Sequence, residues 1–284
     1  MFKRLIMKKD LRWTAIWVLG MVCVGVWDTL FLNKPALRQV TAGFLNTFSV
    51  AFLAVGFTLL LAWGVTLALH FLDTGKNRAP YLLLTFLLNL IRSVPQVVGI
   101  LFGYVAVSAL VEAGFLRSPI VIFSLLALCI SLFVFIEFVD LMRERIAHYQ
   151  KLDFYNAMRV CGISEGRVVN FDILWKNSRI HVLNKLISVF GAAIFLQCSV
   201  DFIISVGLST DVNSVTLPAS LGSLLAKIDS KQDILAIGYT LTHPGYAQNL
   251  FFGHLLGLTV AFLIVFSLMS IYHIANGYAE RHHL

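Results

Sequence analysis

Hydrophobic positions gather in long runs along this chain, and polar residues gather between them. A run of about 18 or more residues almost free of charge predicts a helix that spans a membrane. Pro95 interrupts one such run, where it would break a helix. The predicted spans are residues 13–32, 43–72, 80–111, 119–141, 183–208 and 250–274.

Composition agrees with a protein that is solvated by lipid. Of the 284 residues, 58% are hydrophobic and only 13% are charged, whereas soluble domains are about 25% charged. The net charge of +7 would suggest nucleic acid in a soluble protein. Here the basic residues flank the apolar runs, so membrane orientation explains them better than nucleic acid binding. The predicted fold class is an all-α membrane protein with about six transmembrane helices.

The basic residues also predict the orientation, because cytosolic segments carry the excess of Lys and Arg. With the N-terminus inside, most of the basic residues fall in cytosolic segments, and Arg92 lies within a span. Both termini are therefore expected in the cytosol. The basic residues left outside are Lys34, Arg38, Arg117, Lys227 and Lys231.

The first run is expected to be a retained anchor, not a cleaved signal peptide, because it is long and no A-x-A site follows it. Residues 1–42 form a basic segment with the first span, and residues 43–284 form the core. Two connections are long, one cytosolic (about 142–182) and one external (about 209–249), and long connections are usually functional.

A short helix, a turn and a second helix are predicted inside the cytosolic connection. Phe154, Ala157, Met158 and Cys161 fall at i, i+3, i+4 and i+7, which predicts one apolar stripe. Gly162 fits a left-handed helix stop. Ser164 can cap a following helix. The apolar stripe must pack on its own membrane domain, on the bilayer surface or on another protein.

This segment resembles the EAA loop of ABC importer permeases, whose pattern is E-A-A, three residues, G, nine residues, then I-x-L-P. Asn156-Ala157-Met158 stands at E-A-A, Gly162 at the G, and Asp172-Ile173-Leu174-Trp175 at I-x-L-P. Ala157, Gly162 and Leu174 match, and Arg159 fits the form EAARALG. The Glu, the second Ala and the Pro of the pattern are replaced here.

Flanking segments resemble dipeptide/oligopeptide-type permeases, and the resemblance covers roughly residues 43–284. They are PASLGSLLAK (218–227), HPGY (243–246) and ANGYAERH (275–282). NLIRSVPQVVGILF (89–102) is instead more similar to phosphonate-type permeases. Peptides are therefore the expected substrate class, and phosphonates, metal chelates and other small solutes remain open.

The resemblance implies a type I ABC importer permease fold in a bacterial inner membrane, with a cytosolic coupling helix that seats on an ATPase. It also implies two ATPase subunits, a second homologous permease (a heterodimer is favoured) and an extracytoplasmic substrate-binding protein. ATP and Mg²⁺ would be bound by the ATPases, and this chain would hold no cofactor. The residues expected to couple to the ATPase are Ala157, Arg159, Gly162, Ser164 and Leu174.

Polar residues within spans are functional candidates by default. Arg92 and Gln96 flank Pro95, and Gln197 and Asp201 lie one turn apart on one face of the fifth span. All four are candidates for the translocation path. Arg92 can alternatively pair with Glu137 or Asp201 as a structural contact, and Gln197 can simply join helices.

Three other functions fit the sequence less well. An ion-coupled secondary transporter would show paired half-helices and internal repeats, which the sequence lacks. A membrane enzyme would need clustered His or carboxylates such as HExxH, and no Walker A motif occurs either. The cytosolic segment can also be read as an amphipathic helix attracted to anionic headgroups.

Overall fold

The computed structural model describes residues 8–75, 78–207, 217–253 and 255–282, and every regular element in these ranges is a helix. The long helices are α2 (Lys9–Phe31), α3 (Lys34–Asp73), α6 (Pro119–Gln150), α9 (Arg179–Gly207) and α13 (Leu255–His282). The shorter ones are α4 (Ala79–Ser93), α5 (Gln96–Glu112), α7 (Asp153–Val160), α8 (Glu165–Arg167), η1 (Val168–Asn177), α10 (Leu221–Leu225), α11 (Ile228–Thr242), η2 (Pro244–Tyr246) and α12 (Ala247–Gly253).

The predicted spans are confirmed in number. Five helices are long and apolar enough to cross a membrane, and the bent pair α4–α5 makes six. The predicted break of the third span at Pro95 is confirmed, and the two halves, α4 and α5, meet at 93°. Val94 is extended before Pro95 (φ −88°, ψ 127°), as expected of a residue that precedes proline.

Two connections differ from the prediction. Helix α6 continues to Gln150, so the first long connection begins at Lys151 and not at 142. The described part of the second, predicted as an external connection over 209–249, is largely helical, with α10, α11 and α12. Polar residues end an apolar run without ending the helix, which explains the first difference.

Helix α3 packs along α6 and buries a row of small side chains. Thr47, Ala51, Ala54, Thr58, Ala62 and Thr66 are all fully buried, and they recur at intervals of three or four residues along one face. Small residues let two helix backbones approach closely, which is the usual basis of helix association in lipid. This face holds the centre of the fold.

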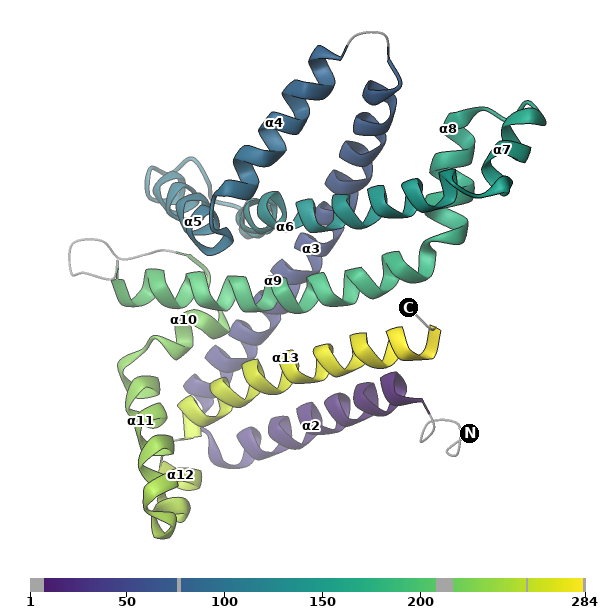
Figure 1. The fold of residues 1–284 in the computed structure, drawn as a ribbon. Helices are drawn as coiled ribbons and strands as arrows, with labels where there is room; N and C mark the ends of the chain where they lie inside the picture. Colours follow the sequence, from purple (N-terminus) through teal and green to yellow (C-terminus); the bar gives the residue numbers. More distant parts are fainter. Residues whose placement is uncertain (1–7, 76–77, 208–216, 254, 283–284) are drawn as a thin grey trace.

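Helix α2 runs side by side with α13 (Figure 1). A Cβ on Gly277 would lie 2.5 Å from the backbone nitrogen of Asp10, so the two helices touch at backbone distance there. Thr259 donates a hydrogen bond to buried Asp28 (2.8 Å) near the other end of α2. Residue 42, where the sequence suggests a division of the chain, lies inside α3.

The two ends of the molecule differ in what they carry (Figure 1). Helices α7 and α8 project at the end where the described chain begins in α2 and finishes in α13. Helices α10, α11 and α12 gather at the opposite end. The long helices between them therefore place two segments far from the bundle centre, one at each end.

Candidate functional site

A tight turn closes helix α7. Gly162 has φ +77°, as the predicted left-handed stop requires. Its N–H donates to the Arg159 carbonyl (3.0 Å), and the Ile163 N–H donates to the Met158 carbonyl (3.1 Å). These two bonds form the Schellman arrangement, which satisfies the last carbonyls of a helix. The chain therefore turns back sharply into α8.

The predicted apolar stripe of α7 does not pack on the chain's own core. Of its four members only Met158 is packed there, beside Tyr155 and Ile163. Phe154 is 37% exposed, and Ala157 and Cys161 are exposed as well. Val160 is 88% exposed. Helix α7 thus presents an uncovered apolar surface, the α7 patch, made of Phe154, Ala157, Val160 and Cys161.

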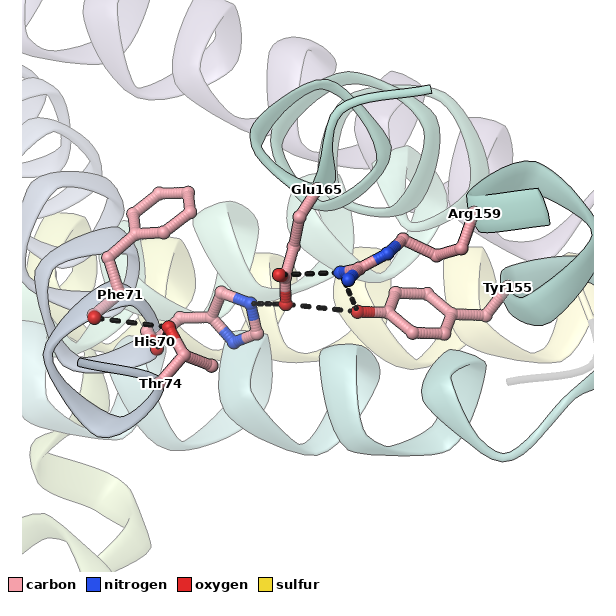
Figure 2. Close-up of polar contacts among 6 residues, drawn as sticks. All are labelled: His70, Phe71, Thr74, Tyr155, Arg159 and Glu165. Atoms are coloured by element: carbon pink, nitrogen blue, oxygen red, sulfur yellow. Dashed lines mark hydrogen bonds and ion pairs between the residues drawn. The ribbon is translucent and has the colours of Figure 1, made fainter. Parts of the chain in front are cut away.

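The carboxylate of Glu165 holds α7 in place (Figure 2). One oxygen accepts a hydrogen bond from the Arg159 guanidinium (2.6 Å). The other accepts from the Tyr155 hydroxyl (3.0 Å) and contacts Nε2 of His70 (3.1 Å). Tyr155 and Arg159 belong to α7, and His70 belongs to the last turn of α3. One side chain therefore joins three segments of the chain.

These contacts shift the acidity of the carboxyl group. Partial burial would raise the pKa of Glu165, but hydrogen bonds from Arg159, Tyr155 and His70 more than offset this effect and hold the pKa below its usual value. The hydrogen bond to Glu165 in turn raises the pKa of Arg159. The cluster therefore stabilises the ionised form of the Glu165 carboxylate.

The other residues predicted to couple lie in different settings. Ser164 stands at the N-cap position of α8, but its side chain makes no capping hydrogen bond. Its carbonyl accepts from the N–H groups of Arg167 and Val168 instead. Leu174 is fully buried, so it supports the segment from within. Arg159 turns back toward Glu165 and does not point outward from the α7 patch.

The second helix of this segment is longer than a single turn. Helix α8 passes directly into the π-helix η1, whose inward face is made of buried Val168, Val169, Ile173 and Leu174. Widened helical turns of this kind are frequently found at functional sites. Glu165 is thus carried by a segment that is anchored in the core.

A second group of charges lies at the break between α4 and α5. Arg92 pairs with Asp140 of α6 (2.8 Å), so pairing with Glu137 or Asp201 is wrong. Gln96 instead donates to Glu137 (3.2 Å), and Glu137 pairs with Lys185 of α9 (2.8 Å). The Arg92 and Asp140 side chains are both 53% exposed. The sequence indicates Arg92 and Gln96 but offers no signal that selects Asp140 as the partner of Arg92 or Glu137 as the partner of Gln96.

Gln197 and Asp201 are not on an open surface of the chain. Both side chains are buried on α9. Gln197 and Ser220 hydrogen-bond the Asp201 side chain, and Ser220 caps α10. A Cβ on Gly222 of α10 would lie 2.3 Å from the carbonyl oxygen of Cys198. The hydrogen bonds of Asp201 therefore join α9 to α10 where the two backbones lie in direct contact.

Among the residues that the structure describes, no three His, Cys, Asp or Glu side chains are grouped so that they could hold a metal ion.

The model of the family described as "Binding-protein-dependent transport system inner membrane component" matches residues 61–282. No curated protein matches the chain. The family match includes α7, Glu165 and the α4–α5 break.

Proposed function

The chain belongs to the family of binding-protein-dependent transport system inner membrane components, and we propose that its α7 patch is the contact through which a separate ATPase drives it. Members of this family are inner membrane permeases of ABC importers with the type I permease fold. They are transport components and not catalysts. An ATPase and a substrate-binding protein are the partners that the family implies.

The observation that carries this proposal is an apolar surface held rigidly in an exposed place. Val160 is 88% exposed, and the helix under it is fixed through Glu165 to the end of α3. Exposed apolar surfaces on a helix that faces water commonly mark protein contacts. A preorganised surface also loses little conformational entropy when it binds.

An amphipathic helix on anionic lipid fits the same segment less well. Such helices carry Lys and Arg on the polar face. On α7 the one basic residue is Arg159, and its guanidinium is already paired with Glu165 (2.6 Å). Asp153 at the start of the helix adds a negative charge. The electrostatics therefore favour a protein partner over a membrane surface.

In the proposed mechanism the ATPase moves α7, and the movement passes into the bundle. Glu165 links α7 to α3, and α3 packs along α6. Nucleotide binding by the ATPases would bias two packings of these helices, facing inward or outward. ATP and Mg²⁺ act on the ATPases, and this chain transmits their movement.

The charged group at the α4–α5 break supports a translocation path or a subunit contact there. Exposed charged side chains are costly against lipid and are normally covered by water or protein. Arg92 and Asp140 are half exposed in this chain, and Gln96, at the start of α5, donates to Glu137 of α6. We therefore keep Arg92 and Gln96 as path candidates. The burial of Gln197 and Asp201 against α10 favours a structural role for these two residues over a place on the path.

The remaining parts of the proposal rest on sequence. The excess of basic residues in the predicted inner segments supports cytosolic termini. Resemblance in the last third supports peptides as the substrate, with phosphonates and other small solutes as the alternative class. The degenerate EAA segment supports a heterodimer with a second permease, because one copy can diverge when its partner retains the pattern.

The test uses the native thiol of Cys161, which is free and exposed at the end of α7. In inside-out vesicles, a membrane-impermeant maleimide should label Cys161 in the chain expressed without ATPase. Assembly with the ATPase should protect it at least about tenfold. A Cys23→Ser background removes the exposed thiol of α2 and serves as the control. Equal labelling with and without ATPase would refute the contact.

A further inference from the structure

An apolar groove of about 600 Å³ opens beside the coupling segment. Helix α3 forms one wall with Leu59 and Trp63, η1 forms another with Trp175, and the start of α9 contributes Leu183 and Leu186. Its volume is that of a site for a small organic ligand. Trp175 is 63% exposed and Leu183 is 48% exposed, so no other part of the described chain covers the groove.

Two basic side chains stand at one end of this groove. Lys176 lies in the last turn of η1 and Arg179 begins α9, and both line the groove. Neither has an acidic partner in the described ranges, in contrast to Arg92, Arg159 and Lys185. The groove is therefore apolar along its length and carries unpaired positive charge at one end.

The two tryptophans place this site at the edge of the membrane. Their rings lie 6.2 Å apart at 67°, and the Trp63 indole donates to Asn170 of η1 (2.7 Å). Tryptophan is enriched where hydrocarbon meets the headgroups. The groove thus runs from the apolar part of α3 toward the end of the bundle that carries α7, which the proposed orientation puts in the cytosol.

We propose that this groove binds an acyl chain of an anionic phospholipid of the cytosolic leaflet, whose phosphate is bound by Lys176 and Arg179. A basic pocket between helices on the cytosolic side matches the headgroup chemistry of such lipids. Arginine and lysine both bind phosphate oxygens through charge-assisted hydrogen bonds. A lipid there would rest on η1 and would support the segment that carries Glu165.

A second copy of a permease is the competing occupant, and charge argues against it. A protein surface would have to bring acidic residues to an apolar groove within the bilayer edge, where charges are costly. An anionic lipid supplies the negative charge at the headgroup level and the apolar chain below it. Lipid therefore matches both ends of the groove at once.

The experiment maps lipid contacts in the assembled importer, reconstituted in phosphatidylcholine vesicles. One of two lipids is added in small proportion, phosphatidylglycerol or phosphatidylcholine, each with a diazirine on its acyl chain. After irradiation, mass spectrometry locates the adducts. We expect adducts on peptides that contain Trp63, Trp175 or Leu183, with phosphatidylglycerol favoured by up to roughly thirtyfold, because each basic residue near the headgroup contributes about a fivefold factor.

The matched variants separate this site from general attraction to anionic lipid. Lys176→Gln with Arg179→Gln should abolish the preference for phosphatidylglycerol at these peptides. Arg12→Gln with Lys151→Gln, at exposed positions outside the groove, should leave it unchanged. Equal adducts from both lipids, or a preference that survives the first pair of changes, would overturn the proposal.

Absence of adducts at the groove with either lipid would also overturn it and would indicate that a protein subunit covers the groove. The readout does not depend on transport, although the choice of leaflet rests on the proposed orientation. Failure of the ATPase contact at α7 would therefore leave adduct formation intact. Loss of adducts would likewise leave the protection of Cys161 unaffected.

Discussion

Substitutions at Gly162 can separate the cost of backbone strain from the loss of contact with the ATPase. Its φ of +77° is a left-handed conformation, which costs a residue with a Cβ about 1–2 kcal/mol. A Cβ placed there would meet nothing within 4 Å, so the folded chain adds no steric term. Replacing Gly also reduces the conformational entropy of the unfolded chain, which stabilises the fold by about 0.4–1 kcal/mol. The net cost should therefore be roughly 1 kcal/mol, and similar for Ala and Phe.

The two substitutions should differ only where a partner approaches. Gly162→Ala and Gly162→Phe are each expected to increase hydrogen exchange of the α7 amides about fivefold, which corresponds to ~1 kcal/mol of local opening. Transport by the importer in proteoliposomes should be largely retained by Gly162→Ala. It should be lost by Gly162→Phe, because a ring at this turn would separate the α7 patch from the ATPase.

Gly114 provides a matched control at the end of α5. It also has φ +77°, and a Cβ on it would likewise meet nothing within 4 Å. It closes its helix with the same pair of hydrogen bonds. Gly114→Phe should therefore cost a similar amount of stability and leave coupling intact. Equal transport by Gly162→Ala and Gly162→Phe, or loss of coupling in Gly114→Phe, would refute the reasoning.

Single contacts elsewhere in the chain lead to three further predictions. Glu165→Gln should loosen α7 and lower substrate-stimulated ATPase activity, and Tyr155→Phe should do so to a smaller extent. Because the pKa of Glu165 is lowered in the folded chain, its contribution to stability is fully present above the ordinary value of about 4.3 and is lost as the pH falls through the lowered pKa. The difference in hydrogen exchange between wild type and Glu165→Gln, measured at matched pH, should therefore shrink progressively as the pH falls below about 4.3. Exchanging the charges in an Arg92→Asp, Asp140→Arg double variant should restore transport that either single change reduces, and an unrescued double variant would show that the charges act separately. Gly222→Ala should lower the midpoint of thermal unfolding, because its Cβ would lie 2.3 Å from a backbone oxygen of α9. An unchanged midpoint would show that α10 can shift away from α9.

Hydropathy predicts the long helices well because the lipid requirement is averaged over many residues. It locates their ends less well. The run ends near Leu141, yet α6 continues to Gln150, because a helix that leaves the membrane keeps its backbone hydrogen bonds in water. Pro95 likewise predicts a break but not its angle of 93°, which depends on how α5 packs against α6.

The cytosolic segment shows what periodicity cannot decide. The stripe on α7 is present at the predicted spacing, but Phe154 and Cys161 are exposed and Tyr155 packs inward. Periodicity identifies an apolar face without saying whether the same chain or another one covers it. The sequence indicates Glu165 only as the start of a helix, because its partners Arg159 and Tyr155 lie across the turn on α7 and His70 lies far away on α3.

Helix α3 connects the two ends of the bundle without an intervening loop. Near its start, Asn46 donates to the Ala219 carbonyl (2.8 Å), and Thr47 accepts from the Leu221 N–H (3.0 Å). Near its end, His70 contacts Glu165 (3.1 Å). Residues 47 and 70 lie about 35 Å apart along a continuous helix at 1.5 Å per residue. We therefore expect that a displacement of α7 by the ATPase is passed to α10 through α3 as one rigid element; disruption of the His70–Glu165 contact should uncouple the two ends.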